Sequence, residues 1–341
     1  MVRPESRIVP PGASPVRVGA GATQRYITAV MLAFGQIAAA QVVAVVPRIP
    51  ATRPPLQPTS PPEGLLRVDS DLVLIPAHVT SRAGAPVTDL RLESFHLYED
   101  DVEQTIASFS AEDEPVSIGL LFDASGSMRN KMDKASEAAA RFFATSNAYD
   151  EFFLVQISGR PKLMARFSSD SEDLLQRIHR FKPGGQTPLF DAIHMALKQM
   201  RNARNNRKAL VILSDGGDNW STHTFRQIRE ALIESDVQLY AMGIFDEDFT
   251  RNHSPEEARG PMLLNALAAQ TGGRLFSVTN LDDLPEIGAQ ISRELRQQYV
   301  LGYYSRNEAH DGKYRRIKVK LSPDRASLRV SFRTGYYAPS E

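Results

Sequence analysis

The sequence predicts a doubly wound α/β domain, built on a mostly parallel sheet, that is inserted into a small antiparallel β-sandwich. Two observations predict this fold class. Across residues 116–297, short apolar runs alternate with helical patterns, which is the order of a parallel sheet covered by helices on both faces. On either side of this region only strand patterns occur. A few isolated strands cannot bury a face alone, so we expect the flanking strands to pair with one another.

The predicted sandwich is supplied by two parts of the chain, 65–115 and 298–337. In the first part, alternating and β-rich runs bounded by turn residues predict strands at 72–77, 95–98 and 105–109. In the second part, the same signals predict strands at 299–304, 315–321 and 327–332.

The α/β region, 116–297, begins with a continuous apolar run at 116–122, as expected for a strand that is buried on both faces. Further strands are predicted at 152–157, 163–167, 209–213, 237–244 and 274–278, of which 163–167 is expected at an edge. Helices are predicted at 128–147, 173–179, 189–203, 225–234, 263–270 and 284–297.

Composition excludes several classes of site and partner. Lys plus Arg and Asp plus Glu each number 40, so the formal net charge is zero and no global field attracts nucleic acid or an acidic membrane surface. The chain contains no cysteine, which excludes disulfides, thiolate metal sites and a cysteine nucleophile.

The N-terminal region, 1–46, has the charge order of a secretory signal peptide. Four arginines and one glutamate precede an apolar run at 26–40 that ends in Ala38-Ala39-Ala40. The alternative is a retained membrane anchor over 26–46. Both interpretations predict export of the rest of the chain to the periplasm, the cell envelope or the medium. A proline-rich linker is expected at 47–64.

Polar residues gather in three loops that the predicted sheet delivers to one edge. The loop 123–127 (DASGS) follows the first buried strand, and the loop 214–218 (SDGGD) follows the strand at 209–213. The loop 184–188 (GGQTP) precedes a helix. In open α/β sheets, ligands bind beyond the carboxyl ends of the strands, where the strand order reverses. If the two strands are neighbours, these loops meet.

The three loops carry two carboxylates and three hydroxyls: Asp123, Ser125, Ser127, Thr187 and Asp215. Hard cations such as Mg²⁺ prefer such an all-oxygen set, with Mn²⁺ and Ca²⁺ as alternatives. The absence of cysteine, and of histidine in these loops, disfavours Zn²⁺. A simpler explanation exists for each loop alone, because Asp or Ser after a strand often caps a helix and Asp-Gly is an ordinary turn. The three together favour a metal site.

At these residues the sequence resembles the metal-ion-dependent adhesion site of von Willebrand factor A domains. The match includes Asp123-x-Ser125-x-Ser127, the Gly-Gly-x-Thr-Pro-Leu setting of Thr187 and the Leu-Ser-Asp-Gly setting of Asp215, and the resemblance extends over about 116–297. The flanks, at 67–73 and 335–337, resemble an exported bacterial group called the acidobacterial-type VWFA-related family.

The resemblance implies a Rossmann-like fold and a role for each site residue. Ser125, Ser127 and Thr187 would contact the metal, whereas Asp123 and Asp215 would hold its waters and orient the hydroxyls. One metal position would remain for an Asp or Glu carboxylate of a protein partner.

We therefore predict a cation-dependent binding or adhesion module rather than an enzyme, with no catalytic residues. The alternatives are a metal-assisted hydrolase and a structural envelope protein with a vestigial site. Trp220, the only tryptophan, is predicted either to contact the partner or to pack under a loop. The polar segment 246–261 is expected to be a loop that shapes partner choice or one that has no role.

Overall fold

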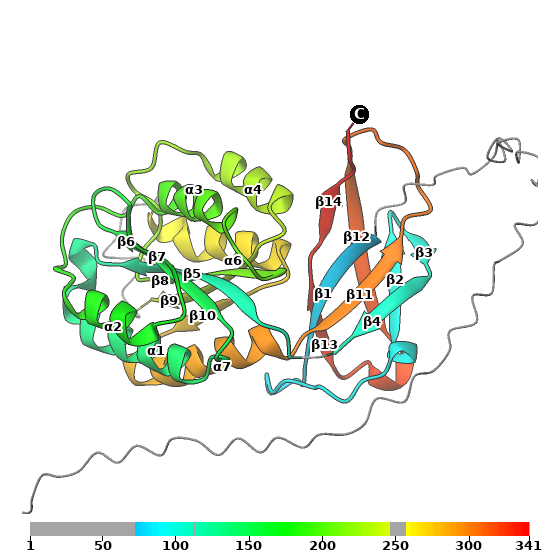
Figure 1. Cartoon of the computed structure of the whole chain (residues 1–341), viewed down its shortest axis with the longest axis horizontal. Coiled ribbons are helices and arrows are strands. Elements are labelled where there is room, and N and C mark those ends of the chain that lie inside the picture. Colours follow the sequence, from blue (N-terminus) through cyan, green and yellow to red (C-terminus); the bar gives the residue numbers. More distant parts are fainter. Residues whose placement is uncertain (1–71, 112, 246–256, 341) are drawn as a thin grey trace, which may run out of the picture. The chain divides into compact units, whose positions relative to one another are not determined.

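The computed structural model describes residues 72–111, 113–245 and 257–340, which form an α/β domain and two antiparallel sheets (Figure 1). This architecture confirms the predicted fold class. The predicted signal peptide or anchor, the proline-rich linker and residues 246–256 of the polar loop lie outside the described residues. None of the helices in the described ranges has the length and apolar character needed to cross a membrane.

The α/β domain is built on a six-stranded sheet with the order β10-β9-β8-β5-β6-β7. Its strands are β5 (Val116–Asp123), β6 (Glu151–Ile157), β7 (Lys162–Ser168), β8 (Arg207–Ser214), β9 (Gln238–Ile244) and β10 (Leu275–Val278). All neighbouring pairs are parallel except β6 and β7, and β7 is an edge strand as predicted. Every residue of β5 is buried, because helices cover both faces of a parallel sheet.

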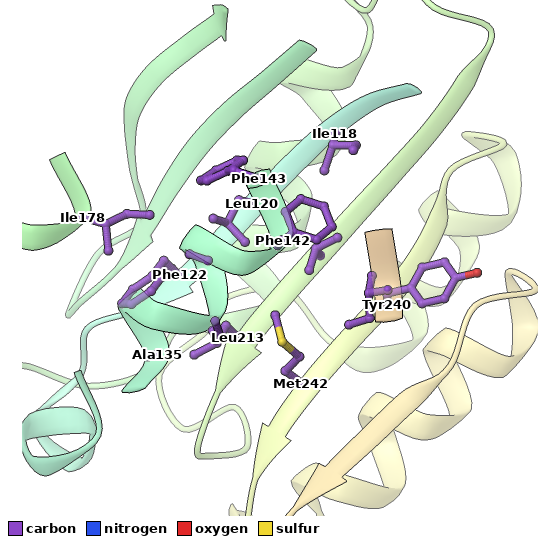
Figure 2. Packing of buried hydrophobic residues seen from close by; sticks show 14 of the residues in the cluster. Ile118, Leu120, Phe122, Ala135, Phe142, Phe143, Ile178, Leu213, Tyr240 and Met242 are labelled. Carbon is purple, nitrogen blue, oxygen red and sulfur yellow. The ribbon is translucent and has the colours of Figure 1, made fainter. Parts of the chain in front are cut away.

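Two layers of helices cover this sheet (Figure 1). One layer contains α1 (Met132–Ala144), α2 (Ser171–His179) and α7 (Leu284–Arg296), and the other contains α3 (Leu189–Met200), α4 (Phe225–Glu234) and α6 (Gly260–Gln270). Figure 2 shows the first core, where Leu120 and Phe122 of β5 lie among α1 side chains such as Phe142. Full burial of each such Leu or Phe contributes about 1.5–3 kcal/mol.

The helix predicted at 128–147 is shorter in the structure. A 3-10 turn, Gly126–Asn130, precedes α1, and Lys131 is the N-cap residue of α1. At the other end, the hydroxyls of Thr145 and Ser146 donate hydrogen bonds to the carbonyl of Phe142 and terminate the helix. Further 3-10 turns lie at Leu92–Ser94, Glu257–Arg259, Leu281–Asp283 and Pro323–Arg325.

The flanking strands pair across the ends of the chain, as predicted. One sheet has the order β13-β1-β11-β4 and the other β14-β12-β2-β3. The strands are β1 (Leu72–Thr80), β2 (Phe95–Glu99), β3 (Val102–Gln104), β4 (Ile106–Ser110), β11 (Tyr299–Tyr304), β12 (Tyr314–Leu321), β13 (Arg329–Phe332) and β14 (Gly335–Tyr337). Apolar side chains of both sheets form one core between them. The three-residue strands β3 and β14 were not predicted, because so short a run shows no alternation.

A buried carboxylate links the two sheets of the sandwich. Glu99 of β2 is 2% exposed and accepts hydrogen bonds from the hydroxyls of Tyr303 at 2.6 Å and Tyr336 at 2.9 Å. Ser305 donates to its other oxygen at 2.7 Å. Tyr303 belongs to β11 in the opposite sheet, so this bond crosses the core. Three donors compensate a charge that would otherwise be costly to bury.

Removal of one of these donors should destabilise the fold. Tyr303→Phe keeps the ring but leaves buried Glu99 with two donors, so we expect the free energy of unfolding to fall by about 1–3 kcal/mol. Tyr304→Phe is the matched control, because Tyr304 is 50% exposed and should change stability little. Urea denaturation followed by far-ultraviolet circular dichroism measures both, and equal losses in the two variants would contradict the role given to Glu99.

Candidate metal site

The register of β5 and β8 brings two of the predicted loops together. Phe122 of β5 pairs with Leu213 of β8, so the chain leaves both strands at the same edge of the sheet. Asp123 is the last residue of β5, and Asp215 directly follows β8. The strand β5 lies between β6 and β8, so the strand order reverses here, at the position where open α/β sheets bind ligands.

A hydrogen-bonded chain of side chains joins the first loop to the third. The hydroxyls of Ser125 and Ser127 lie 3.1 Å apart, and that of Ser127 donates to Oδ1 of Asp215 at 2.8 Å. Ser125 is 2% exposed and Asp215 is fully buried. Two residues predicted from the first loop and one from the third thus form one contiguous set of oxygens.

Asp123 organises the loop that follows it. Its carboxylate accepts a hydrogen bond from the backbone N–H of Ser125 at 2.8 Å and from the hydroxyl of Ser214 at 2.5 Å. Complete burial raises the pKa of Asp123 to about 6; the Ser214 bond opposes this change and the neighbouring charge of Asp215 adds to it. The nearby charge of Asp215 therefore disfavours the charged form of Asp123, and a cation bound at these loops would relieve that cost.

The second loop is joined to the first through the backbone. The N–H of Gly126 donates to the carbonyl of Gly185 at 3.0 Å, and the N–H of Gly184 donates to the carbonyl of Ala124 at 2.9 Å. Gly185 has a φ of +76°, and a Cβ there would lie 2.8 Å from the nitrogen of Gly159. Only glycine fits this position.

Thr187 is buried beside these loops, at 3% exposure. Its backbone N–H donates to Oδ1 of Asn219 at 2.8 Å, and its carbonyl accepts from the N–H of Asn219 at 3.2 Å. Within the part of the chain that the structure describes, no hydrogen bond joins the Thr187 hydroxyl to the other four predicted side chains. Hydrogen bonds therefore join four of the five predicted residues directly. The fifth, Thr187, lies on a loop whose backbone is bonded to the first loop.

Lys131 enters this set although sequence reasoning did not single it out. Its ammonium lies 2.8 Å from Oδ2 of Asp215 and is largely covered, with 16% of the side chain exposed. Both carboxylate oxygens of Asp215 are therefore engaged, one by Ser127 and one by Lys131. The available signal was position: Lys131 follows Ser127 by four residues, about one helical turn.

The loop after Asp215 is held against α6. A Cβ added at Gly260, the first residue of α6, would lie 2.5 Å from the Cα of Gly217. This close contact explains why glycine stands at position 260. The predicted loop 246–261 is too long at its C-terminal end, because α6 already starts at Gly260. Proline is favoured in the first turn of a helix, and Pro261 occupies that place here.

Trp220 lies on a segment that is tied to the start of α3. The carboxylate of Asp218 accepts a hydrogen bond from the N–H of Phe190 at 3.1 Å, and the hydroxyl of Ser221 accepts one from the N–H of Asp191 at 3.0 Å. Trp220 itself is 58% exposed, so it does not pack under a loop, which was one of the two predictions for it. A rigid segment presents the indole to solvent close in sequence to Asp215.

The chemistry of the site suits a hard cation. Two carboxylates and neighbouring hydroxyls supply only oxygen donors, the kind that Mg²⁺ and Ca²⁺ prefer. The described residues contain no group of three or more His, Cys, Asp or Glu that could hold a metal ion. A cation here would therefore depend on serine and threonine hydroxyls and on water.

The match to one family model agrees with this fold. Residues 118–217 match the family model of the von Willebrand factor type A domain. A von Willebrand factor type A structure from Catenulispora acidiphila is 13% identical, covers 81% of this chain and 76% of its own, and has a TM-score of 0.47. An aerotolerance-related membrane protein from Bacteroides fragilis NCTC 9343, whose structure carries multiple mutations to serine, is 16% identical, with 53% and 98% covered and a TM-score of 0.43.

A third similar structure is the vWF domain of the type V pili tip protein Mfa5 from Porphyromonas gingivalis. It is 13% identical, with 53% of this chain and 95% of that chain covered and a TM-score of 0.40. A comparison with curated proteins gave no match. All five predicted site residues lie within the range that matches the family model. The similarity to the von Willebrand factor type A domain therefore extends over the region of the candidate site.

Proposed function

We propose that the chain is a binding module that holds an anionic protein partner through a divalent cation at the carboxyl edge of β5 and β8. The observation that carries this proposal is the continuous set of oxygens that runs from Ser125 through Ser127 to buried Asp215, with buried Asp123 beside it. The cation is proposed to be Mg²⁺, with Mn²⁺ or Ca²⁺ as alternatives.

The hydroxyl and carboxylate residues would have different roles at the cation. The hydroxyls of Ser125, Ser127 and Thr187 would face the cation, while the carboxylates of Asp123 and Asp215 would hold waters and orient the serines. The bound cation would supply a concentrated positive charge and one directional position for a carboxylate of the partner. The proposed role requires no bond to be made or broken.

Trp220 is proposed to be a second contact with the partner. Exposed aromatic side chains on rigid segments contribute strongly to interfaces, because little conformational entropy is lost when they are covered. The hydrogen bonds of Asp218 and Ser221 to α3 supply that rigidity. The indole thus belongs to a fixed segment that also bonds Thr187 of the proposed site, through Asn219.

We place the protein outside the cytoplasm, in the periplasm, the envelope or the medium. The signal-like sequence at 1–46 supports this location. We propose no contact with nucleic acid, and contact with a membrane only through a retained N-terminal anchor.

Metal-assisted hydrolysis is less well supported than binding. Such a reaction needs a general base near the attacking water. The titratable group that the structure adds to the predicted five is Lys131, and its ammonium is paired with Asp215. A charged ammonium has no lone pair with which to accept a proton, and the carboxylates of Asp123 and Asp215 already accept hydrogen bonds from the protein.

Loss of one hydroxyl should weaken cation binding without unfolding the chain. We expect Ser127→Ala to reduce Mg²⁺ affinity at least about tenfold, because it removes a proposed ligand and the orientation of Asp215. Ser146→Ala, which removes a hydroxyl at the end of α1, is the control. Calorimetric titration of the purified chain measures all three proteins.

Equal Mg²⁺ binding by the wild type and Ser127→Ala would place the cation elsewhere. Absence of binding in the wild type calls for a repeat with a soluble carboxylate present. Binding that then develops would show that the partner completes the coordination. Continued absence would favour the structural alternative with a vestigial site.

The single tryptophan offers an independent readout. Mn²⁺ at the proposed site should quench Trp220 fluorescence in a saturable manner, because the paramagnetic ion would lie near the indole. Excess Mg²⁺ should reverse the quenching, and Asp215→Ala should leave only weak, non-saturating quenching. Saturable quenching that persists in Asp215→Ala would contradict the proposed position of the cation.

A variant of Trp220 should separate cation binding from partner binding. We expect Trp220→Ala to keep its Mg²⁺ affinity within about twofold and to lose metal-dependent capture of a partner from exported proteins of the source cell. Tyr149→Ala is the control, because Tyr149 is 76% exposed just before β6, at the opposite edge of the sheet. Capture that is equally reduced in both variants would deny Trp220 a specific role.

A further inference from the structure

Lys131 brings a positive charge into the proposed site, at a place fixed by the backbone. Its N–H donates to the carbonyl of Met128 at 2.8 Å, and its carbonyl accepts from the N–H of Ala135 at 2.9 Å. Lys131 joins the 3-10 turn to α1, and its backbone is held by both. Its side chain therefore reaches Asp215 from a fixed position.

This ion pair differs from those on the surface of the same helix. Lys131 and Asp215 are 16% and 0% exposed, whereas Lys134 pairs with Glu137 and Asp282 at 39% exposure. Charges that are shielded from water interact more strongly and are less screened by salt. The ammonium of Lys131 therefore contributes to the electrostatics of the site, while that of Lys134 contributes little.

The charges of the site can be counted. The carboxylates of Asp123 and Asp215 carry two negative charges, and the ammonium of Lys131 neutralises one of them. A divalent cation would bring the total to a single positive charge, which an anionic ligand would neutralise. Without the lysine, the same loaded site would already be neutral, and an anionic ligand would have less advantage over a neutral one.

We propose that Lys131 is a specificity-determining residue, which weakens the binding of the divalent cation and makes the loaded site select an anionic ligand over a neutral one. This inference rests on the proposed function. Its physical basis is that the ammonium repels the cation and occupies Oδ2 of Asp215, which would otherwise hold a water of the cation, and that its charge leaves the loaded site with excess positive charge.

The first arm of the test measures cation binding. Lys131→Met keeps most of the side-chain length and removes the charge, so we expect about tenfold tighter Mg²⁺ binding in calorimetry. Lys131→Arg keeps the charge and should stay within about threefold of the wild type, as should Lys134→Met. Circular dichroism and thermal unfolding establish that each variant is folded.

The second arm measures ligand choice at saturating Mg²⁺. The probes are N-acetyl-aspartate methylamide and its asparagine counterpart, which differ in charge but little in shape, and the Trp220 indole signal in NMR reports their binding. We expect the wild type to prefer the aspartate probe, and Lys131→Met to lose about tenfold of that preference. Lys131→Arg should retain it.

The outcomes separate the two proposals. Unchanged or weaker Mg²⁺ binding in folded Lys131→Met, with binding lost in Ser127→Ala, would overturn the role of Lys131 and leave the proposed function standing. Mg²⁺ binding by Lys131→Met alone would support the inference in its strongest form. Absence of Mg²⁺ binding from the wild type and from Lys131→Met, with either probe present, would overturn both.

Discussion

The site depends on one constraint, which is the burial of two carboxylates at the ends of neighbouring strands. The parallel pairing of β5 with β8 places Asp123 and Asp215 at the same edge, and both are fully buried. Buried carboxylates need donors or cations. The surrounding groups meet this need: Ser214 and the Ser125 N–H bond Asp123, and Ser127 and Lys131 bond Asp215.

The same constraint accounts for the glycines and for the loop partners. Loops that bring donors to buried carboxylates must approach one another closely, and side chains would prevent this at Gly185 and at the contact of Gly260 with Gly217. The segment that carries Trp220 is then held by α3, whose first turn follows Thr187 directly. The fold thus brings the carboxylates and serine hydroxyls together and bonds Asn219, the residue before Trp220, to Thr187, and the sandwich is stabilised separately around Glu99.

Much of the fold could be predicted because its signals are local. Continuous apolar runs predicted the buried strands, and the return of strand patterns after residue 298 predicted the sandwich. The five site residues followed from three loops and a family motif. Lys131 was missed, because its partner Asp215 is 84 residues away and its position four residues after Ser127 does not by itself indicate an ion pair. The predicted start of α1 was also wrong, because a 3-10 turn precedes the helix. Gly126 in that turn bonds the carbonyl of Gly185, which is distant in the sequence.

The most direct test is a crystal structure of the protein grown with Mn²⁺, with anomalous diffraction recorded at the manganese absorption edge. A cation site formed by the three loops should give one strong anomalous peak at the carboxyl edge of β5 and β8, with hydroxyl oxygens of Ser125, Ser127 and Thr187 within coordination distance. A map without a peak there, or with its strong peak bound to other residues, would contradict the claim that these three loops form a cation site.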